Sequence, residues 1–350
     1  MKAVLIAFLS ILCVAQDTTK QQTPKIFEIP TADVYTRYRY IDTNAGTVTA
    51  DDLQYRFTGR FRVNIPKTGT YFGSRVETGS SIGSSWSNTG IGRSKSEWTL
   101  NAKTIFIGQK LGKKAAIEVG AMDMEQGAGS EATYADVDTW TEGYRVRLTD
   151  LEGKYMPSKI SATFGFIGDF NTPNAFARLY RLGEVNYAQI LAEKKLTRAI
   201  RASAEYDRLR GIDLFRTAAK VSLPNSWWIN DAQVENVVRV APRATSGWAF
   251  NLVKSKNRLG WLNPGIYYSH LPTGVYKVGT QQALLNGDVY GTGKRIGFTT
   301  KYQATKALDF STLITRKLDS DPGFRWRAQI VARYQIAPLL NQLQKALTSK

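Results

Sequence analysis

Residues 53–65 read LQYRFTGRFRVNI, and apolar side chains fall on alternate positions from Tyr55 onward. The positions between them hold polar side chains, including Arg56, Arg60 and Arg62. Successive side chains of a β-strand point to opposite faces, so this stretch predicts a strand with one apolar and one cationic face. The apolar face must lie against a second sheet or against lipid, and which of the two it contacts decides the function.

The same alternation recurs along the whole chain, whereas convincing amphipathic helices are scarce. The clearest segments are 34–40, 71–78, 97–108, 115–122, 142–149, 159–166, 196–206, 295–303, 308–314 and 324–336. Repeated short alternating segments are typical of an all-β barrel or sandwich, here with about 14–16 strands. The region between 207 and 295 is the hardest to divide into strands.

The lengths of the predicted connections alternate through the first half of the chain. Long links such as IDTNAGTVTADD (41–52) and EQGAGSEATYADVDTWTE (125–142) alternate with short ones such as PKTG (66–69) and LGKK (111–114). Outer-membrane barrels show this pattern because short turns lie on the periplasmic side and long loops face outward. The chain is therefore predicted to form a transmembrane antiparallel β-barrel, a closed up-and-down meander.

The N-terminal sequence MKAVLIAFLSILCVAQD (1–17) combines one lysine, an apolar run and the small residues of a cleavage site. It predicts a secretory signal peptide over residues 1–15, too short for a spanning helix. A periplasmic segment at 16–32, the barrel at 33–336 and a C-terminal tail at 337–350 are expected to follow. Leucines at helical spacing in the tail indicate either a short amphipathic helix that plugs or caps the periplasmic mouth, or a frayed end.

Composition excludes most catalytic and metal chemistry. The sequence has 1 cysteine, within the predicted signal peptide, and 1 histidine, His270. Nucleophilic catalysis and thiolate or multi-histidine metal sites need more of these residues, so we expect no enzyme, no cofactor and no metal centre. The acidic pairs Asp136 with Asp138 and Asp319 with Asp321 leave calcium in the outer loops as an alternative, although neither pair has the full spacing of a calcium loop.

The formal net charge of +18 suggests an anionic partner, and export of the chain argues against nucleic acid. The arginines predicted on the polar strand faces are Arg37, Arg39, Arg56, Arg60, Arg62, Arg75, Arg145, Arg147, Arg325, Arg327 and Arg333. Arginine facing lipid would cost roughly 2–4 kcal/mol at the bilayer midplane, so these side chains are expected to face the lumen. There they would focus a positive potential that favours anions.

Closure of the barrel would make the first and last strands neighbours, and so gather several of these arginines into one basic wall. The excess of base over acid predicts that many of them stay unpaired. The alternative is that they pair with luminal acids such as Glu77, Glu118 and Glu205 and simply hold the wall together.

The stretch IEVGAMDMEQGAGSEATYADVDTWTEGYRVRL, from Ile117 to Leu148, has a strand with a glycine motif, an acidic loop, a tryptophan and a G-x-R-x-R strand. In this pattern, and in TGRFRV and YFGSRVETG, the chain resembles Gram-negative porins of the alginate-export type. The chain departs from this class at its end, where no aromatic residue closes the last strand.

The resemblance implies a monomeric or trimeric pore in the bacterial outer membrane for small or anionic solutes, acidic sugars among them. Contact with the lipid bilayer, with lipopolysaccharide and with the outer-membrane assembly machinery is expected as well. It carries over no specific binding residue.

Two other interpretations stay open beside that of a passive porin-like channel for small hydrophilic, preferentially anionic solutes. A secreted β-sandwich that binds or cleaves acidic polysaccharide would use the same alternation with its arginines in water. A plugged barrel would be a structural or adhesive surface protein, embedded in the membrane but without conductance.

Overall fold

The computed structural model describes residues 26–43, 46–92, 99–134, 138–151, 153, 155–168, 171–224, 229–254, 260–278, 281–282, 290–320 and 323–348. The strands are β1 (Phe27–Thr43), β2 (Val48–Ile65), β3 (Thr70–Thr78), β4 (Gly90–Gly92), β5 (Leu100–Leu111), β6 (Ala115–Asp123), β7 (Trp140–Thr149), β8 (Lys159–Phe166), β9 (Tyr187–Lys195), β10 (Ile200–Leu209), β11 (Ile212–Ser222), β12 (Asp231–Ala241), β13 (Thr245–Val253), β14 (Leu262–Leu271), β15 (Lys277–Val278), β16 (Gln281–Gln282), β17 (Gly293–Gln303), β18 (Leu308–Lys317) and β19 (Phe324–Gln335). The helices are α2 (Thr273–Tyr276) and α3 (Ala337–Thr348), with 3-10 turns at Ala175–Ala177 and Leu179–Arg181.

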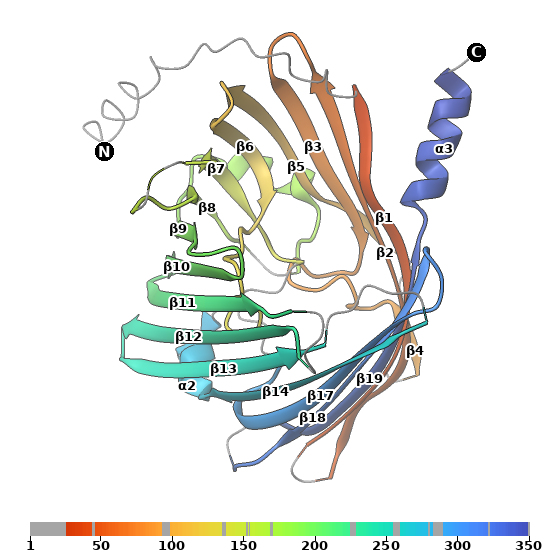
Figure 1. The fold of residues 1–350 in the computed structure, drawn as a ribbon, viewed down its shortest axis with the longest axis vertical. Coiled ribbons are helices and arrows are strands. Elements are labelled where there is room, and N and C mark those ends of the chain that lie inside the picture. The colour runs from red at the N-terminus through yellow and green to blue at the C-terminus, as the bar shows by residue number, and fades with distance from the viewer. Residues whose placement is uncertain are drawn as a thin grey trace.

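The long strands close into a barrel (Figure 1). Each pairs antiparallel with its neighbours in sequence, and β1 pairs with both β2 and β19, so Asp33 lies opposite Thr58 on one side and Gln335 on the other. The short β4 adds only to the first part of β2, and β15 and β16 form a separate two-stranded sheet. Within the described residues the fold is a closed 16-strand antiparallel meander, which confirms the predicted fold class.

Burial is inverted relative to a water-soluble protein. On β19, Trp326, Ile330 and Tyr334 are 36%, 55% and 48% exposed, whereas Arg327 on the other face is fully buried. Soluble proteins bury large apolar side chains and leave charged ones in water. The apolar face of the strands is therefore the outer surface of the barrel, as expected for a wall in lipid, and the interpretation as a secreted β-sandwich is wrong.

The first connection is shorter than predicted. Most of residues 41–52, expected to form a long loop, belong to β1 and β2, which are separated only by residues 44–47. The two aspartates that suggest a loop, Asp51 and Asp52, bond across the strand pair instead. The Tyr38 hydroxyl donates to Asp51 at 2.8 Å, and Arg39 lies 3.2 Å from Asp52. The predicted alternation of long and short connections therefore fails at its first step.

The long connections nevertheless leave the same end of the barrel, because consecutive strands are antiparallel. This end, here called the loop end, carries the described residues of four long connections: 79–92 and 99, 124–134 and 138–139, 167–168 and 171–186, and 272–278, 281–282 and 290–292. The opposite end, here called the turn end, carries residues 66–69 and 112–114. The beginning of β1 and the end of β19 also lie at the turn end.

The barrel begins at Phe27 and not at residue 33 as predicted. Residues 27–32 extend β1 and pair with β2, with Phe27 opposite Val63. Pro30 obscures this strand in the sequence because it interrupts the alternation. A shift in register between Glu28 and Thr31 accommodates it, as is usual for proline in a sheet. The predicted signal peptide at 1–15 lies outside the described residues.

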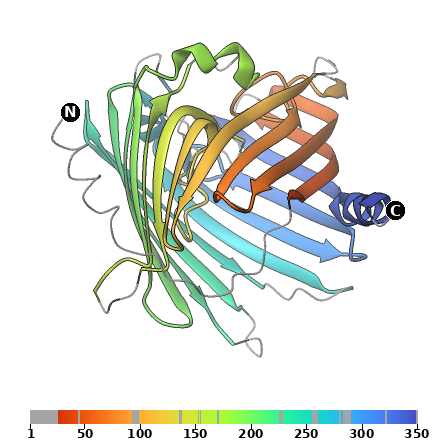
Figure 2. The same cartoon turned by 90° about the horizontal axis from the view of Figure 1, so that it is seen from above.

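Residues 337–348 form α3, one of the two forms expected for the tail. The helix stands outside the ring of strands beside β1 and does not enter the barrel mouth, so of the alternatives for the tail the plug is excluded (Figures 1 and 2). None of the helices in the described ranges has both the length and the apolar character needed to cross a bilayer.

Candidate functional site

The described residues of the connection between β6 and β7, 124–134 and 138–139, fold into the barrel and are here called the inward loop. At its tip, the backbone N–H groups of Ala132 and Thr133 donate to Glu235 on β12 at 3.1 and 2.9 Å. Arg216 on β11 donates to the Thr133 carbonyl at 2.7 Å. Since β6 and β12 are several strands apart in the ring, the inward loop crosses part of the interior and narrows it.

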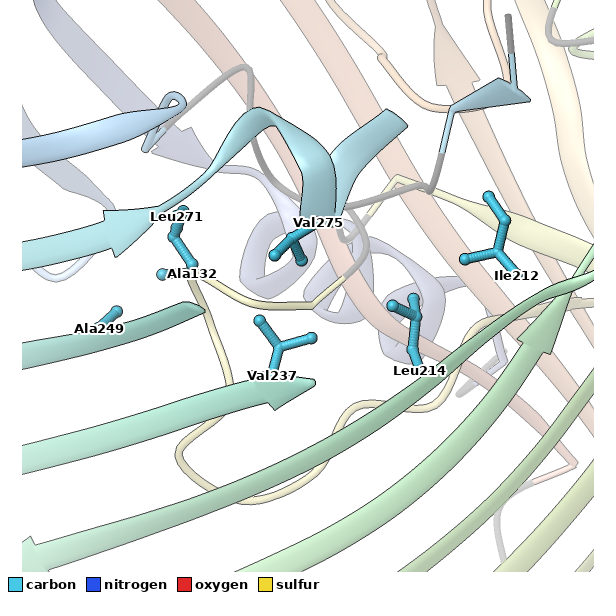
Figure 3. Packing of buried hydrophobic residues seen from close by; sticks show 7 residues of the cluster. All are labelled: Ala132, Ile212, Leu214, Val237, Ala249, Leu271 and Val275. Atoms are coloured by element: carbon cyan, nitrogen blue, oxygen red, sulfur yellow. The ribbon is translucent and has the colours of Figure 1, made fainter. Parts of the chain in front are cut away.

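An apolar cluster holds the tip of the inward loop against the far wall (Figure 3). Its buried members are Ala132, Ile212, Leu214, Val237, Ala249, Leu271 and Val275. Val275 comes from α2, and Tyr290, which packs on the cluster, comes from the same long connection. The Tyr290 hydroxyl also donates to Glu131 of the inward loop at 3.0 Å. Two connections from the loop end therefore meet inside the barrel.

The base of the inward loop is held by cations of the barrel wall. Asp138 lies 2.8 Å from Arg56 and accepts the Ser85 hydroxyl at 2.6 Å. Glu125 lies 2.9 Å from both Arg147 and Lys159. Burial by itself raises the pKa of both carboxyls, but the neighbouring cations outweigh it. As a result the pKa of Glu125 falls to about 2, and the pKa of Asp138 is also well below its ordinary value.

We expect the docking of the inward loop to weaken only in acid. Because the pKa of Glu125 falls from 4.5 to about 2, its stabilisation is complete above pH 4.5, declines below that value and is lost near pH 2. In heat unfolding followed by gel mobility, the wild type should exceed Glu125→Gln in midpoint temperature at neutral pH. This difference should shrink below pH 4.5 and vanish near pH 2. A difference that stays constant down to pH 2 would contradict the proposed ion pairing.

The structure places most of the predicted arginines in ion pairs. The pairs are Arg39 with Asp52, Arg56 with Glu77 and Asp138, Arg60 and Arg75 with Asp123, Arg145 and Arg147 with Glu118, Arg325 with Asp42, and Arg333 with Asp33. The others donate to side-chain amides: Arg37 to Gln54, Arg62 to Asn64 and Arg327 to Gln329. The expectation that many of these arginines stay unpaired is therefore wrong. A buried guanidinium without a polar partner is costly, so the wall carries its own acids and amides.

The strands that carry the expected basic wall are indeed neighbours, in the order β19, β1, β2, β3. Its cations are balanced or covered, as at Arg37, whose guanidinium lies 4.1 Å from the ring centre of Trp86. Glu205, expected to pair with one of the predicted arginines, pairs instead with Arg216 at 2.9 Å. Sequence reasoning did not single out Arg216, which also holds the inward loop.

A second basic surface, missed by the sequence analysis, lies on the inner face at the turn end. Lys195, Arg201 and Lys220 are direct cross-strand partners on β9, β10 and β11. They share the face of Ser203, which donates to the Ala128 carbonyl of the inward loop, so they point into the barrel. These three residues are here called the turn-end patch.

The turn-end patch is exposed and poorly neutralised. Lys195 and Arg201 are exposed, and in the described part of the chain no carboxylate lies within ion-pair distance of either. Only Lys220 has an acid nearby, Asp231 at 3.9 Å. Like charges placed directly opposite each other destabilise a sheet, so the patch lowers the local stability of the strand pairs that carry it.

The sequence does contain the signal for the turn-end patch. In LTRAIRASAEY (196–206), Arg201 has the same parity as the inner-face residues Ser203 and Glu205. The register that sets Arg201 beside Lys195 and Lys220 comes only from strand pairing. The patch could therefore be predicted residue by residue but not as a cluster.

Solved porins share this architecture at low sequence identity. The OmpF of Salmonella typhi, in complex with daunomycin, has a TM-score of 0.57 and 13% identity, over 88% of this chain and 97% of that chain. Two mutants of the Rh. blastica porin have TM-scores of 0.52 and 0.51 and 11% identity, over 88% of this chain and 99% of theirs. The chain has the fold of a porin-like outer-membrane β-barrel. No protein-family model matches the sequence, and no curated protein does. For this porin-like barrel, the likeness establishes the fold alone.

Proposed function

We propose that this porin-like barrel is an outer-membrane channel that passes small hydrophilic solutes passively and prefers anions. The observation that carries the proposal is the turn-end patch. Its cations face the interior, and Lys195 and Arg201 are exposed there, whereas the arginines on β1 to β3 are mostly matched by acids. Within low-dielectric walls, unmatched charge of one sign raises the local concentration of the opposite ion.

The solute class follows from the same groups. Arginine and lysine recognise carboxylates and phosphates, and the guanidinium does so with two parallel hydrogen bonds. Acidic sugars are therefore suitable solutes, because they combine a carboxylate with hydroxyl groups that the polar wall can bind. The inward loop would set the size limit.

The proposal includes neither catalysis nor a metal. Among the described residues there is no group of three or more histidine, cysteine, aspartate or glutamate side chains suited to a metal ion. For calcium, Asp136 and Asp321 lie outside the described residues. Asp138 is engaged by Arg56, and Asp319 accepts the Lys294 N–H at 2.6 Å.

Several of the expected partners also belong to the proposal. The exposed outer band fits the acyl chains of a bilayer, and export to the outer membrane would bring the chain to lipopolysaccharide and the assembly machinery. A monomer and a homotrimer both stay open. Cross-linking in native membranes, followed by gel electrophoresis without heating, would distinguish them.

The test is conductance in a planar bilayer. With a tenfold KCl gradient across the membrane, we expect a stepwise current whose reversal potential shows that chloride is more permeant than potassium. A potassium-selective reversal potential would remove the anion preference and leave the channel. Absence of conductance from correctly folded protein would remove the channel and favour the plugged, structural barrel.

A further inference from the structure

The helix α3 lies at a step in the barrel wall. At the turn end, β19 pairs with β1 only as far as Asp33, so residues 27–32 of β1 have β2 on one side and, among the described residues, no strand on the other. The chain continues from β19 into α3 along this edge. The Ile336 N–H donates to the Ala32 carbonyl at 2.8 Å, and the Asn341 amide donates to the Ile29 carbonyl at 3.4 Å. The helix thus occupies the place that a longer β19 would take.

The apolar side of the amphipathic helix α3 faces away from the barrel. Ala337 is only 9% exposed, and Asn341, which bonds to β1, lies near the same side of the helix. Leu339 and Leu343, one turn apart on the other side, are 52% and 53% exposed. A helix on a water-soluble protein turns its apolar side toward the protein. Here the apolar side faces away, as it does on the strands of the barrel wall.

We propose that α3 is a lipid-contacting helix that seals the seam between β19 and β1, with Leu339 and Leu343 among phospholipid acyl chains. The exposed side chains nearest the seam, Val34 on β1 and Tyr334 on β19, belong to the outer apolar band, so the leucines continue a surface already in lipid. Unpaired backbone groups are strongly unfavourable in hydrocarbon. A helix satisfies its own backbone internally and can cover the free edge of β1. Helices with one apolar side commonly lie at the boundary between head groups and acyl chains.

The proposal is tested by the solvent contact of a spin label on α3. The full chain with Cys13→Ser carries Leu343→Cys or Leu339→Cys and is reconstituted in phosphatidylcholine vesicles, after unheated gel mobility has confirmed folding. Collision rates of the nitroxide with oxygen, which concentrates in lipid, and with a water-soluble nickel chelate are then compared. Ile330→Cys on the outer face of β19 is the lipid reference. Lys306→Cys in the exposed turn between β17 and β18 is the water reference.

We expect labels at 339 and 343 to behave like the label at 330, with oxygen collisions favoured over nickel collisions several-fold more than at 306. A label at 343 that matches 306 would overturn the proposal, since the helix would then lie in water. A label shielded from both reagents would also overturn it, because a protein surface, such as a second copy of the chain, would then cover the leucines. Neither outcome depends on whether the channel prefers anions.

Discussion

A channel that carries Lys195→Glu and Arg201→Glu should lose its preference for anions and become selective for cations. The two substitutions change the charge of the turn-end patch by four units on the inner face. At roughly 10 Å in water each unit contributes about 0.4 kcal/mol, and screening in 0.1 M salt reduces this by about two thirds. Anion entry is disfavoured and cation entry favoured together, so the permeability ratio should shift by about fivefold to tenfold. The reversal potential in a KCl gradient measures this shift directly.

The matched control changes the same charge away from the inner face. Lys67→Glu and Lys306→Glu place two glutamates on exposed turns of the same end, in the connections 66–69 and 304–307. If the total charge at this end of the barrel alone set the selectivity, the two double variants would have equal reversal potentials. Equal reversal potentials would therefore show that the turn-end patch does not control selectivity.

Replacement of Glu235, which holds the tip of the inward loop, should widen the channel. Glu235→Ala removes the carboxylate that accepts from the Ala132 and Thr133 N–H groups and from the Thr133 hydroxyl. Hydrogen bonds to a charged group are each worth about 1.5–3 kcal/mol, so most of the polar attachment of the tip disappears. We expect a larger single-channel conductance and faster entry of large neutral sugars in a liposome-swelling assay.

Two further variants serve as controls for the conductance of Glu235→Ala. Glu235→Gln keeps one acceptor and should fall between the wild type and Glu235→Ala. Gln233→Ala lies on the same strand and is also buried, but it has no bond to the inward loop in the described structure, and it should leave conductance unchanged. If Glu235→Ala folds as the wild type does and its conductance is also unchanged, the inward loop does not form the constriction.

Much of the fold could be predicted from short stretches of sequence. In 53–65 and 324–336 the period of two is regular enough to separate the outer from the inner face, and the buried Arg327 between the exposed Trp326 and Ile330 agrees with it. The boundaries were less certain where polar or proline residues interrupt the pattern. Residues 27–32 and most of residues 41–52 belong to strands, and these interruptions hide them in the sequence.

Which partner each arginine contacts could not be predicted in the same way. Arg56 and Asp138 are far apart in sequence, and they meet only because the inward loop folds back onto the wall. Arg216 and Glu235, which hold the tip of this loop, have no local signature that distinguishes them from other inner-face charges.

The sequence by itself determined a barrel with an apolar outside and a charged inside, because alternation is a property of neighbouring residues on one strand. The tertiary structure alone decided which charges cancel, because ion pairing depends on strand register and on the path of the inward loop. It also left Lys195, Arg201 and Lys220 together at the turn end, and it placed the leucines of α3 outside the wall. The alternation along a strand thus determines which face a side chain occupies, whereas closure of the barrel determines which residues it contacts.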